Sequence, residues 1–186
     1  MGERIVDFEV GRLRPWRESD AESLVRHAND RRIWRNMRDL FPHPYTDDSA
    51  RRFLSMAIAD HADSFLAIEV DGQAVGGIGY TLHTDIERIS SEIGYWLSPV
   101  YWGRGIMSAA VRAFTRAVFK WRPELERIYA LPIAWNPASA RVLERAGFKL
   151  EGTMRRAVLK DGEVMDQWLY GLVRSDLEHV TANVGR

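Results

Sequence analysis

The segment from Trp102 to Ser108 has the residue types of an anion-binding loop. It contains two glycines and an arginine, and an apolar-periodic helix follows directly. The first N–H groups of a helix have no intrahelical acceptor, and the helix dipole adds a partial positive charge there. Glycine lets the backbone approach a phosphate closely, and an arginine adds a cation. The pattern predicts a diphosphate cradle made by Trp102, Gly103, Arg104, Gly105, Ile106, Met107 and Ser108.

Two other interpretations of these glycines stay open. Gly103 and Gly105 can serve only a tight turn between a strand and a helix. Their spacing also nearly matches a dinucleotide-binding fingerprint, with Glu124 about 20 residues further on. Ser108 replaces the third glycine of that fingerprint, however, and an antiparallel meander precedes the loop where a β–α–β unit of a parallel sheet is needed. These two departures disfavour a nicotinamide or flavin site.

The loop follows three segments with the pattern of strands. Residues 64–70, 73–82 and 89–97 are strand-like, and Asp71-Gly72 is a hairpin signal between the first two. No helix fits between these segments. Because parallel neighbours need a crossover of a dozen or more residues, we expect an antiparallel meander.

The rest of the chain alternates helices and strands. Helical periodicity covers residues 19–28, 46–60, 106–121 and 137–146. Ser19 and Glu22 have the spacing of a capping box, and Gly147 is placed to end the last of these helices. Further strands are expected at residues 8–16, at 127–133 and from Phe148 on, with a hairpin turning at 160–163 and a short helix in the tail at 174–186. The sum predicts a mixed α+β sheet in one domain, residues 1–186.

Composition limits the classes of function. Hydrophobic residues make up 46% of the 186 residues, and 26 basic residues balance 26 acidic ones. This profile is typical of a globular domain and gives no overall field that favours DNA or a membrane surface. The absence of cysteine excludes a disulfide scaffold, a thiolate metal site and a cysteine nucleophile. No signal peptide and no span of ~18 apolar residues is visible, so we expect a cytoplasmic protein.

Two motifs together resemble a known family. The sequence "SEIGYWLSPVYWGRGIMSAA" leads into the long helix, and "NPASARVLERAGF" begins at Asn136. With "GRLRPWRESDAESL" and "FPHPYTDDSARRFL" upstream, the chain resembles the GNAT superfamily of acetyl-CoA-dependent N-acetyltransferases, in its RimJ/RimL-like branch, which acetylates the N-termini of ribosomal proteins. The family's phosphate loop, Gln/Arg-x-x-Gly-x-Gly/Ala, falls on residues 102–107, where the fourth position is kept and the first and last differ.

The resemblance implies a fold and a position for acetyl-CoA. The fold is α+β, a mostly antiparallel twisted sheet with a splayed parallel strand pair, flanked by about four helices. The pyrophosphate of acetyl-CoA would lie on residues 102–108, and the pantetheine arm would run between the strand ending at Leu97 and the strand at 127–133. Asn136 and Ser139 match a second cofactor-contacting motif. They are equally suited to cap and begin a helix, because Pro137 follows Asn136.

The resemblance also implies a chemistry of direct transfer without a metal. An amine with a pKa near 10 must lose a proton before it attacks, and the departing thiolate must gain one. Glu92 is the candidate base, and its alternatives are a solvated glutamate or one paired with Arg88 or Arg127. Related enzymes often use a tyrosine as the acid, but Leu143 holds that position here, which leaves Ser139 or water. A backbone N–H near Leu97 would stabilise the oxyanion.

The acceptor side is less specified by the sequence. Asp166 and Trp96 are the predicted substrate contacts. The alternative for Asp166 is a salt bridge, and the alternative for Trp96 is packing in the core. The acceptor is a protein N-terminal α-amine or a small-molecule amine, and a homodimer is compatible with the sequence. The alternative hypothesis is a non-catalytic acyl-CoA-binding protein, which the substitution at Leu143 makes conceivable.

Overall fold

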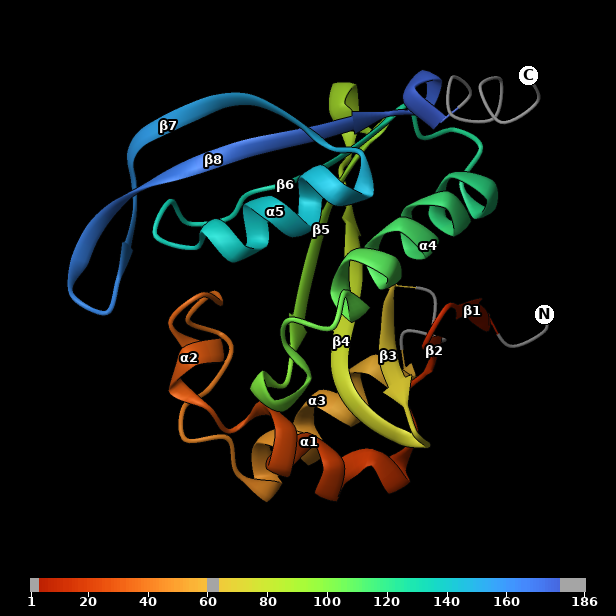
Figure 1. Ribbon diagram of the computed structural model, residues 1–186, viewed down its shortest axis with the longest axis vertical. Helices are drawn as coiled ribbons and strands as arrows, with labels where there is room; N and C mark the ends of the chain where they lie inside the picture. Colours follow the sequence, from red (N-terminus) through yellow and green to blue (C-terminus); the bar gives the residue numbers. More distant parts are fainter. Residues whose placement is uncertain (1–3, 60–63, 178–186) are drawn as a thin grey trace. The chain divides into compact units, whose positions relative to one another are not determined.

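The computed structural model describes residues 4–59 and 64–177, whose strands form one eight-stranded sheet (Figure 1). The sheet order is β1-β2-β3-β4-β5-β6-β8-β7. The strands are β1 (Val6–Phe8), β2 (Gly11–Pro15), β3 (Phe65–Val70), β4 (Gln73–Leu82), β5 (Ser90–Leu97), β6 (Arg127–Ala130), β7 (Lys149–Lys160) and β8 (Glu163–Val173). The helices are α1 (Ala21–Ala28), α2 (Arg31–Trp34), α3 (Asp47–Ala59), α4 (Ile106–Trp121) and α5 (Pro137–Ala146).

The predicted sheet is confirmed, including its single parallel pair. β3 and β4 are antiparallel and turn at Asp71-Gly72, where both residues have positive φ, as a tight hairpin requires. β4 and β5 are also antiparallel, because Ser98 N–H donates to Val75 O while His83 N–H donates to Ser90 O. β5 and β6 run parallel over three residue pairs, the last of which joins Glu92 to Tyr129. The glycine segment therefore does lie in a β–α–β unit, but antiparallel strands flank that unit on both sides.

The chain divides into two compact units. The first comprises Met1–Gly79 and Gly94–Ala110, and the second comprises Tyr80–Ile93 and Val111–Arg186. The first unit has an apolar cluster under α1 and α3 that includes Trp16, Leu24, Leu54 and Trp96. The second buries side chains from α4, β6, α5 and β8, namely Phe114, Val118, Ile128, Leu143 and Leu172. Each unit thus has its own set of buried apolar side chains.

Two predictions in the first unit were wrong. The strand expected at 8–16 is found only as β2, from Gly11, and the short strand β1 that ends at Phe8 and pairs with it was not predicted. The capping box at Ser19 does not form. Asp20 instead accepts hydrogen bonds from both terminal nitrogens of Arg14, at 2.7 and 2.8 Å, and from Arg17 N–H at 2.8 Å. Arg14 is only 2% exposed and also binds Glu69, so this buried ion pair fixes the entry to α1.

Other differences are smaller. The short helix α2 was not predicted, although Asp30 caps it by accepting from Arg32 N–H at 2.8 Å. β6 ends at Ala130 rather than at residue 133, and beyond it Ile133 forms only an isolated bridge to Gln167. The hairpin at 160–163 is confirmed, as is Gly147 at the end of α5 with φ 101°. Of the predicted tail helix, residues 174–177 are helical and residues 178–186 lie outside the described part.

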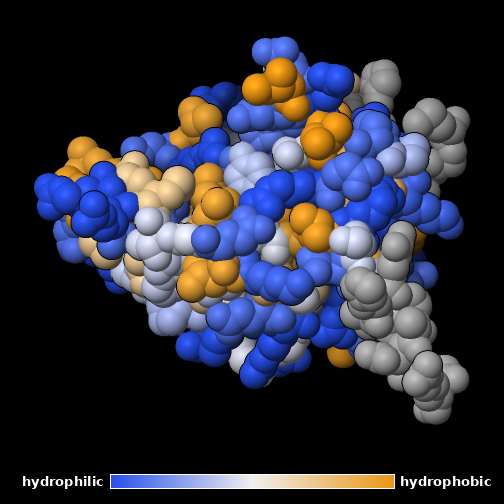
Figure 2. All heavy atoms as spheres, turned by 90° about the horizontal axis from the view of Figure 1, so that it is seen from above, coloured by the Kyte–Doolittle hydropathy of each residue, from blue (hydrophilic) through white to orange (hydrophobic). Residues whose placement is uncertain are grey.

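The surface in Figure 2 is mostly hydrophilic, with apolar residues in small groups among charged ones. None of the helices in the described part of the chain is both long enough and apolar enough to cross a membrane.

Candidate active site

The glycine loop, defined as residues 102–108, connects β5 to α4 through an exposed backbone. Gly103 and Gly105 have φ values of 77° and 76°, in the left-handed region that favours glycine. A Cβ added at either position would meet no atom within 4 Å, so no packing contact requires a glycine there. The open space beside both residues is therefore available to a ligand.

The first turn of α4 combines buried side chains with backbone donors that have no acceptor within the helix. Ile106, Met107 and Ser108 are at most 8% exposed, so they anchor the helix in its unit. The N–H groups of a first helical turn have no intrahelical acceptor, and the bond that closes this turn joins Ala109 N to Gly105 O at 3.1 Å. These three residues can contact an anion only through their backbone.

Trp102 connects the loop to the end of β5. Its indole N–H donates to Leu97 O at 2.7 Å, so two predicted site residues are in contact. The Arg32 guanidinium lies 5.7 Å from the centre of the Trp102 ring, and Arg104 lies 5.3 Å from that of Tyr101. Arg104 itself is exposed. The loop thus presents one arginine beside open glycines, as an anion site needs.

His27 supports the loop from α1, a role that the sequence analysis missed. It is 8% exposed, its Nδ1 lies 3.1 Å from Ser98 Oγ, and its ring lies 5.9 Å from Tyr101. No local signal could have revealed this, because 71 residues separate His27 from Ser98.

Trp96 lies in the apolar cluster of the first unit. It is 8% exposed, and its ring meets Phe41 edge-on at 5.9 Å between centroids. Gly77 leaves room for it, since a Cβ there would lie 2.7 Å from the indole nitrogen. Core packing, the alternative interpretation, therefore explains the position of Trp96, and its contact with an acceptor stays a prediction.

In the second unit, Glu92 lies on the face of β5 opposite the core. Its neighbours Ser91 and Ile93 are 0% and 3% exposed, whereas Glu92 is half-buried, as strand alternation predicts. The two arginines considered as its partners bind other groups. Arg88 donates to Asp85 O at 2.8 Å, and Arg127 forms an ion pair with Glu151. Hydrogen bonding in this pair raises the pKa of Arg127 and lowers the pKa of Glu151.

Asn136 and Ser139 are joined at the start of α5. The Asn136 side-chain oxygen accepts from Ser139 N–H at 3.1 Å, so its capping role is observed. Contact of either residue with a cofactor stays a prediction. Further along the helix, Leu143 is fully buried and carries no ionisable group. This position therefore cannot supply a proton.

Asp166 holds a bulge in the β7–β8 hairpin. Its carboxylate accepts from Arg156 N–H at 2.8 Å, where Arg156 has a φ of 52° and the strand register shifts. The alternative interpretation of Asp166 was a salt bridge, but its carboxylate binds this backbone amide and not a charged side chain. Asp166 O also accepts from Ala134 N–H at 3.0 Å, which places Asp166 beside the segment leading to Asn136. A substrate contact by Asp166 stays a prediction.

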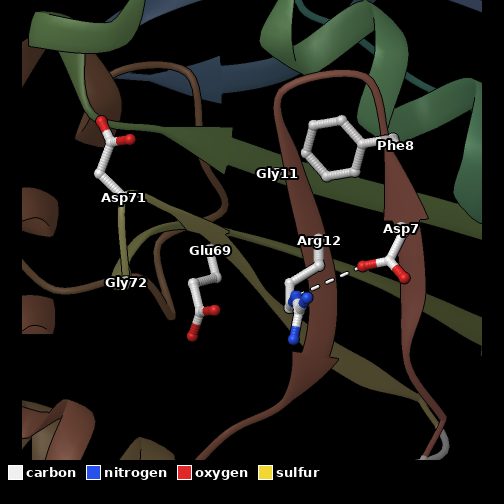
Figure 3. Close-up of a pocket in the computed structure, with 7 residues that line it drawn as sticks. All are labelled: Asp7, Phe8, Gly11, Arg12, Glu69, Asp71 and Gly72. Carbon is white, nitrogen blue, oxygen red and sulfur yellow. Dashed lines mark ion pairs between the residues drawn. The ribbon is translucent and has the colours of Figure 1, made fainter.

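A shallow hollow also lies beside β1–β3 (Figure 3). The charged side chains in it are Asp7, Arg12, Glu69 and Asp71. Arg12 pairs with Asp7 at 3.3 Å, and Glu69 is bound by the buried Arg14. None of the predicted site residues lines this hollow, so it is not part of the predicted active site.

Comparison with known proteins gives matches over most of the chain. The family described as "Acetyltransferase (GNAT) domain" matches residues 12–149. The N-acetyltransferase YnaD of Bacillus subtilis (strain 168) is 24% identical over 165 residues, 88% of this chain and 94% of YnaD. The ribosomal-protein-serine acetyltransferase of Escherichia coli (strain K12) is 30% identical over 113 residues, 61% of this chain and 62% of that protein.

A solved structure also matches. Mycobacterium smegmatis RimJ, in complex with a CoA-disulfide, has a TM-score of 0.78 and is 27% identical. The match covers 99% of this chain and 94% of RimJ.

Proposed function

The chain is an N-acetyltransferase of the GNAT family, and from that premise we propose that it moves the acetyl group of acetyl-CoA directly to a primary amine. The family match covers the glycine loop, β6 and α5, which contribute most of the residues that the proposal uses. We further propose that residues 1–186 act as one catalytic domain. β4, β5 and α4 each continue from one compact unit into the other, which supports this.

The observation that carries the proposal is the open backbone of the glycine loop. Gly103 and Gly105 leave free space where side chains would stand, and the first turn of α4 follows. Coenzyme A carries a diphosphate, which suits a helix N-terminus. Hydrogen bonds to charged groups contribute about 1.5–3 kcal/mol each, enough for several to anchor the cofactor. The structural neighbour RimJ was solved with a CoA-disulfide, which supports the same ligand class here.

The proposed reaction is direct attack on the thioester. Glu92 takes a proton from the ammonium group, and the amine nitrogen then bonds to the carbonyl carbon. The carbon–sulfur bond breaks, and the thiolate takes a proton from Ser139 or from water, since Leu143 cannot donate one. A backbone N–H near Leu97 would stabilise the oxyanion. Because the chain contains no cysteine, no cysteinyl intermediate can form.

The acceptor we propose is an α-amine at a protein N-terminus or a small-molecule amine, bound near Asp166 and Trp96. Similarity to a ribosomal-protein-serine acetyltransferase supports the first class. The reaction would take place in the cytoplasm, where acetyl-CoA and ribosomes are found.

The buried Leu143 favours one other candidate, a protein that binds acyl-CoA without catalysis. Glu92→Gln separates the two, because it removes the base and keeps the shape of the side chain. The enzyme should lose turnover while its acetyl-CoA affinity stays nearly intact. If neither form acetylates any tested amine but both bind acetyl-CoA, the binding protein is the better account.

Thermal unfolding tests the ligand itself. Acetyl-CoA at 100 times its dissociation constant should stabilise the fold by about 2.7 kcal/mol, and NAD at the same concentration should have no effect. Stabilisation by NAD alone would contradict the proposal and favour a dinucleotide site.

A further inference from the structure

Three polar side chains lie in a row in the second unit, the first two joined by a hydrogen bond and the last two close enough for an ion pair. Tyr129 OH lies 2.8 Å from His83 Nε2, and the two rings stack with centroids 5.6 Å apart. On the other side of the imidazole, Glu87 Oε2 lies 3.8 Å from His83 Nδ1. The order is phenol, imidazole and carboxylate, which are groups able to pass a proton along.

The row formed by Tyr129, His83 and Glu87 crosses β5 next to Glu92. Tyr129 belongs to β6 and is the registered partner of Glu92, so both side chains lie on the same face of the parallel pair. His83 follows β4 and is bonded to Ser90 on the opposite edge of β5. The Tyr129 ring must therefore pass over β5 between Ser90 and Glu92 to reach His83. Adjacent strands lie about 4.8 Å apart, so the side chains of Glu92 and Tyr129 leave the sheet side by side.

An ion pair holds the other side of Tyr129. The Arg127 guanidinium lies 5.7 Å from the centre of the Tyr129 ring and is itself bound to Glu151 at 2.7 Å. Gly171, the partner of Tyr129 on β8, leaves room for this pair, since a Cβ there would lie 2.2 Å from Glu151 Oε1. Among the described residues, the charged groups around Tyr129 and His83 are thus Glu92 from β5, Arg127 from β6, Glu151 from β7 and Glu87 from the segment after β4.

The end of this row that lies farthest from Glu92 is open to solvent. The His83 side chain is 27% exposed and the Glu87 side chain is 72% exposed. Neither residue contributes to the apolar core, so packing alone does not account for the arrangement. A path from a half-buried carboxylate through a partly exposed imidazole to solvent is what a general base needs in order to return to its ionised state between turnovers.

We propose that Tyr129 and His83 relay the proton that Glu92 takes from the amine out to solvent, with Glu87 orienting the imidazole. The inference rests on the proposed function. Protonated Glu92 gives its proton to the Tyr129 oxygen while the Tyr129 hydroxyl proton moves to His83 Nε2. The imidazolium, stabilised by Glu87, then loses its Nδ1 proton to water, and exchange with solvent restores the starting tautomer. Tyr129, His83 and Glu87 are positioning residues, because they act through Glu92.

The test compares acetyl transfer by Tyr129→Phe and His83→Ala with the unsubstituted protein. Each variant should lower kcat about tenfold, leave KM for acetyl-CoA unchanged and keep the thermal stabilisation by acetyl-CoA. The pH profile of kcat should change in His83→Ala, and added imidazole should restore its turnover. Tyr170→Phe is the matched control, since Tyr170 also bonds a side chain, Glu144 at 2.9 Å, and should retain full activity.

The outcomes separate the two proposals. If the unsubstituted protein acetylates an amine and both variants match it in kcat and pH profile, the relay is wrong and the proposed function stands. If kcat falls without rescue by imidazole and with an unchanged pH profile, the residues are only structural and the relay is again wrong. If the unsubstituted protein transfers no acetyl group to any amine, the proposed function fails, and the relay fails with it.

Discussion

The starts of α4 and α5 are built in opposite ways. Both helices follow a strand of the same parallel pair, α4 after β5 and α5 after β6. α4 begins after two exposed glycines with positive φ and open space beside them. α5 begins with Asn136, whose side chain accepts the bond from Ser139 N–H. The first helix begins beside open space, whereas the second satisfies one of its own donors.

This difference separates two kinds of helix start, one that stabilises the fold and one that is suited to bind a ligand. A capped start gains stability from its own residues and needs no partner. A glycine-led start loses that gain and also costs more backbone entropy on folding, so it implies a compensating ligand. The proposed diphosphate site should therefore depend more strongly on the start of α4 than on the start of α5.

The largest expected effect is at Gly105. Gly105→Val places a branched side chain in the open space of the loop, at a backbone φ of 76° that such residues rarely adopt. The stabilisation of about 2.7 kcal/mol by acetyl-CoA at 100 times its dissociation constant should disappear. Thermal unfolding with and without acetyl-CoA measures this.

The control for Gly105→Val is Gly72→Val in the β3–β4 turn. Gly72 has a φ of 74° and equally open surroundings, so backbone strain is matched. Gly72→Val should lose stability without losing the response to acetyl-CoA. An unchanged response in Gly105→Val would show that the glycine loop is only a turn.

An intermediate effect is expected at Asn136. Asn136→Ala removes the cap of α5 and should lower the free energy of unfolding by about 1 kcal/mol. Asn136→Asp keeps an acceptor oxygen and should retain most of the stability. Denaturant unfolding measures both variants. A large loss of acetyl-CoA affinity in Asn136→Asp, with stability intact, would show that α5 also binds the cofactor and would weaken the contrast with α4.

The smallest effect is expected at Arg104. Its guanidinium is exposed and lies over Tyr101, so it acts in high dielectric where single charge pairs contribute about 0.2–1 kcal/mol. Arg104→Ala should weaken acetyl-CoA binding a few-fold, and the difference should shrink as salt increases. Calorimetric titration at two salt concentrations tests this, with Arg116→Ala, an exposed arginine further along α4, as the control. A much larger loss would mean that the side chain and not the backbone holds the phosphates.

The elements that could be predicted are those specified by local patterns. Asp71-Gly72 gave the β3–β4 turn, the apolar period gave α4, and the Asn136-Pro137 pair with Gly147 gave both ends of α5. The turn between β1 and β2 was not visible, because residues 8–16 keep strand-like alternation through it. The capping box at Ser19 failed because residues 18–20 form a 3-10 turn and α1 begins at Ala21 with Asp20 at its N-cap, where the buried Arg14 binds it.

The candidate site divides in the same way. The glycine loop and the α5 cap were visible because each is a continuous stretch of sequence whose backbone geometry its own residues impose. The support of the loop by His27 was not, and neither was the crossing of β5 by Tyr129 to reach His83, 46 residues earlier. Asp166 was found, but its bond to the Arg156 amide depends on a register shift in the hairpin.

By itself, the sequence determined the longer strands and helices from β3 on, the turns at Asp71-Gly72 and at 160–163, and the open start of α4, since these follow from φ preferences, periodicity and missing side chains within a few residues. Only the tertiary structure decided which side chains meet across the sheet. Strand register sets those meetings, and a shift of one residue would move Tyr129 to the other face, away from Glu92.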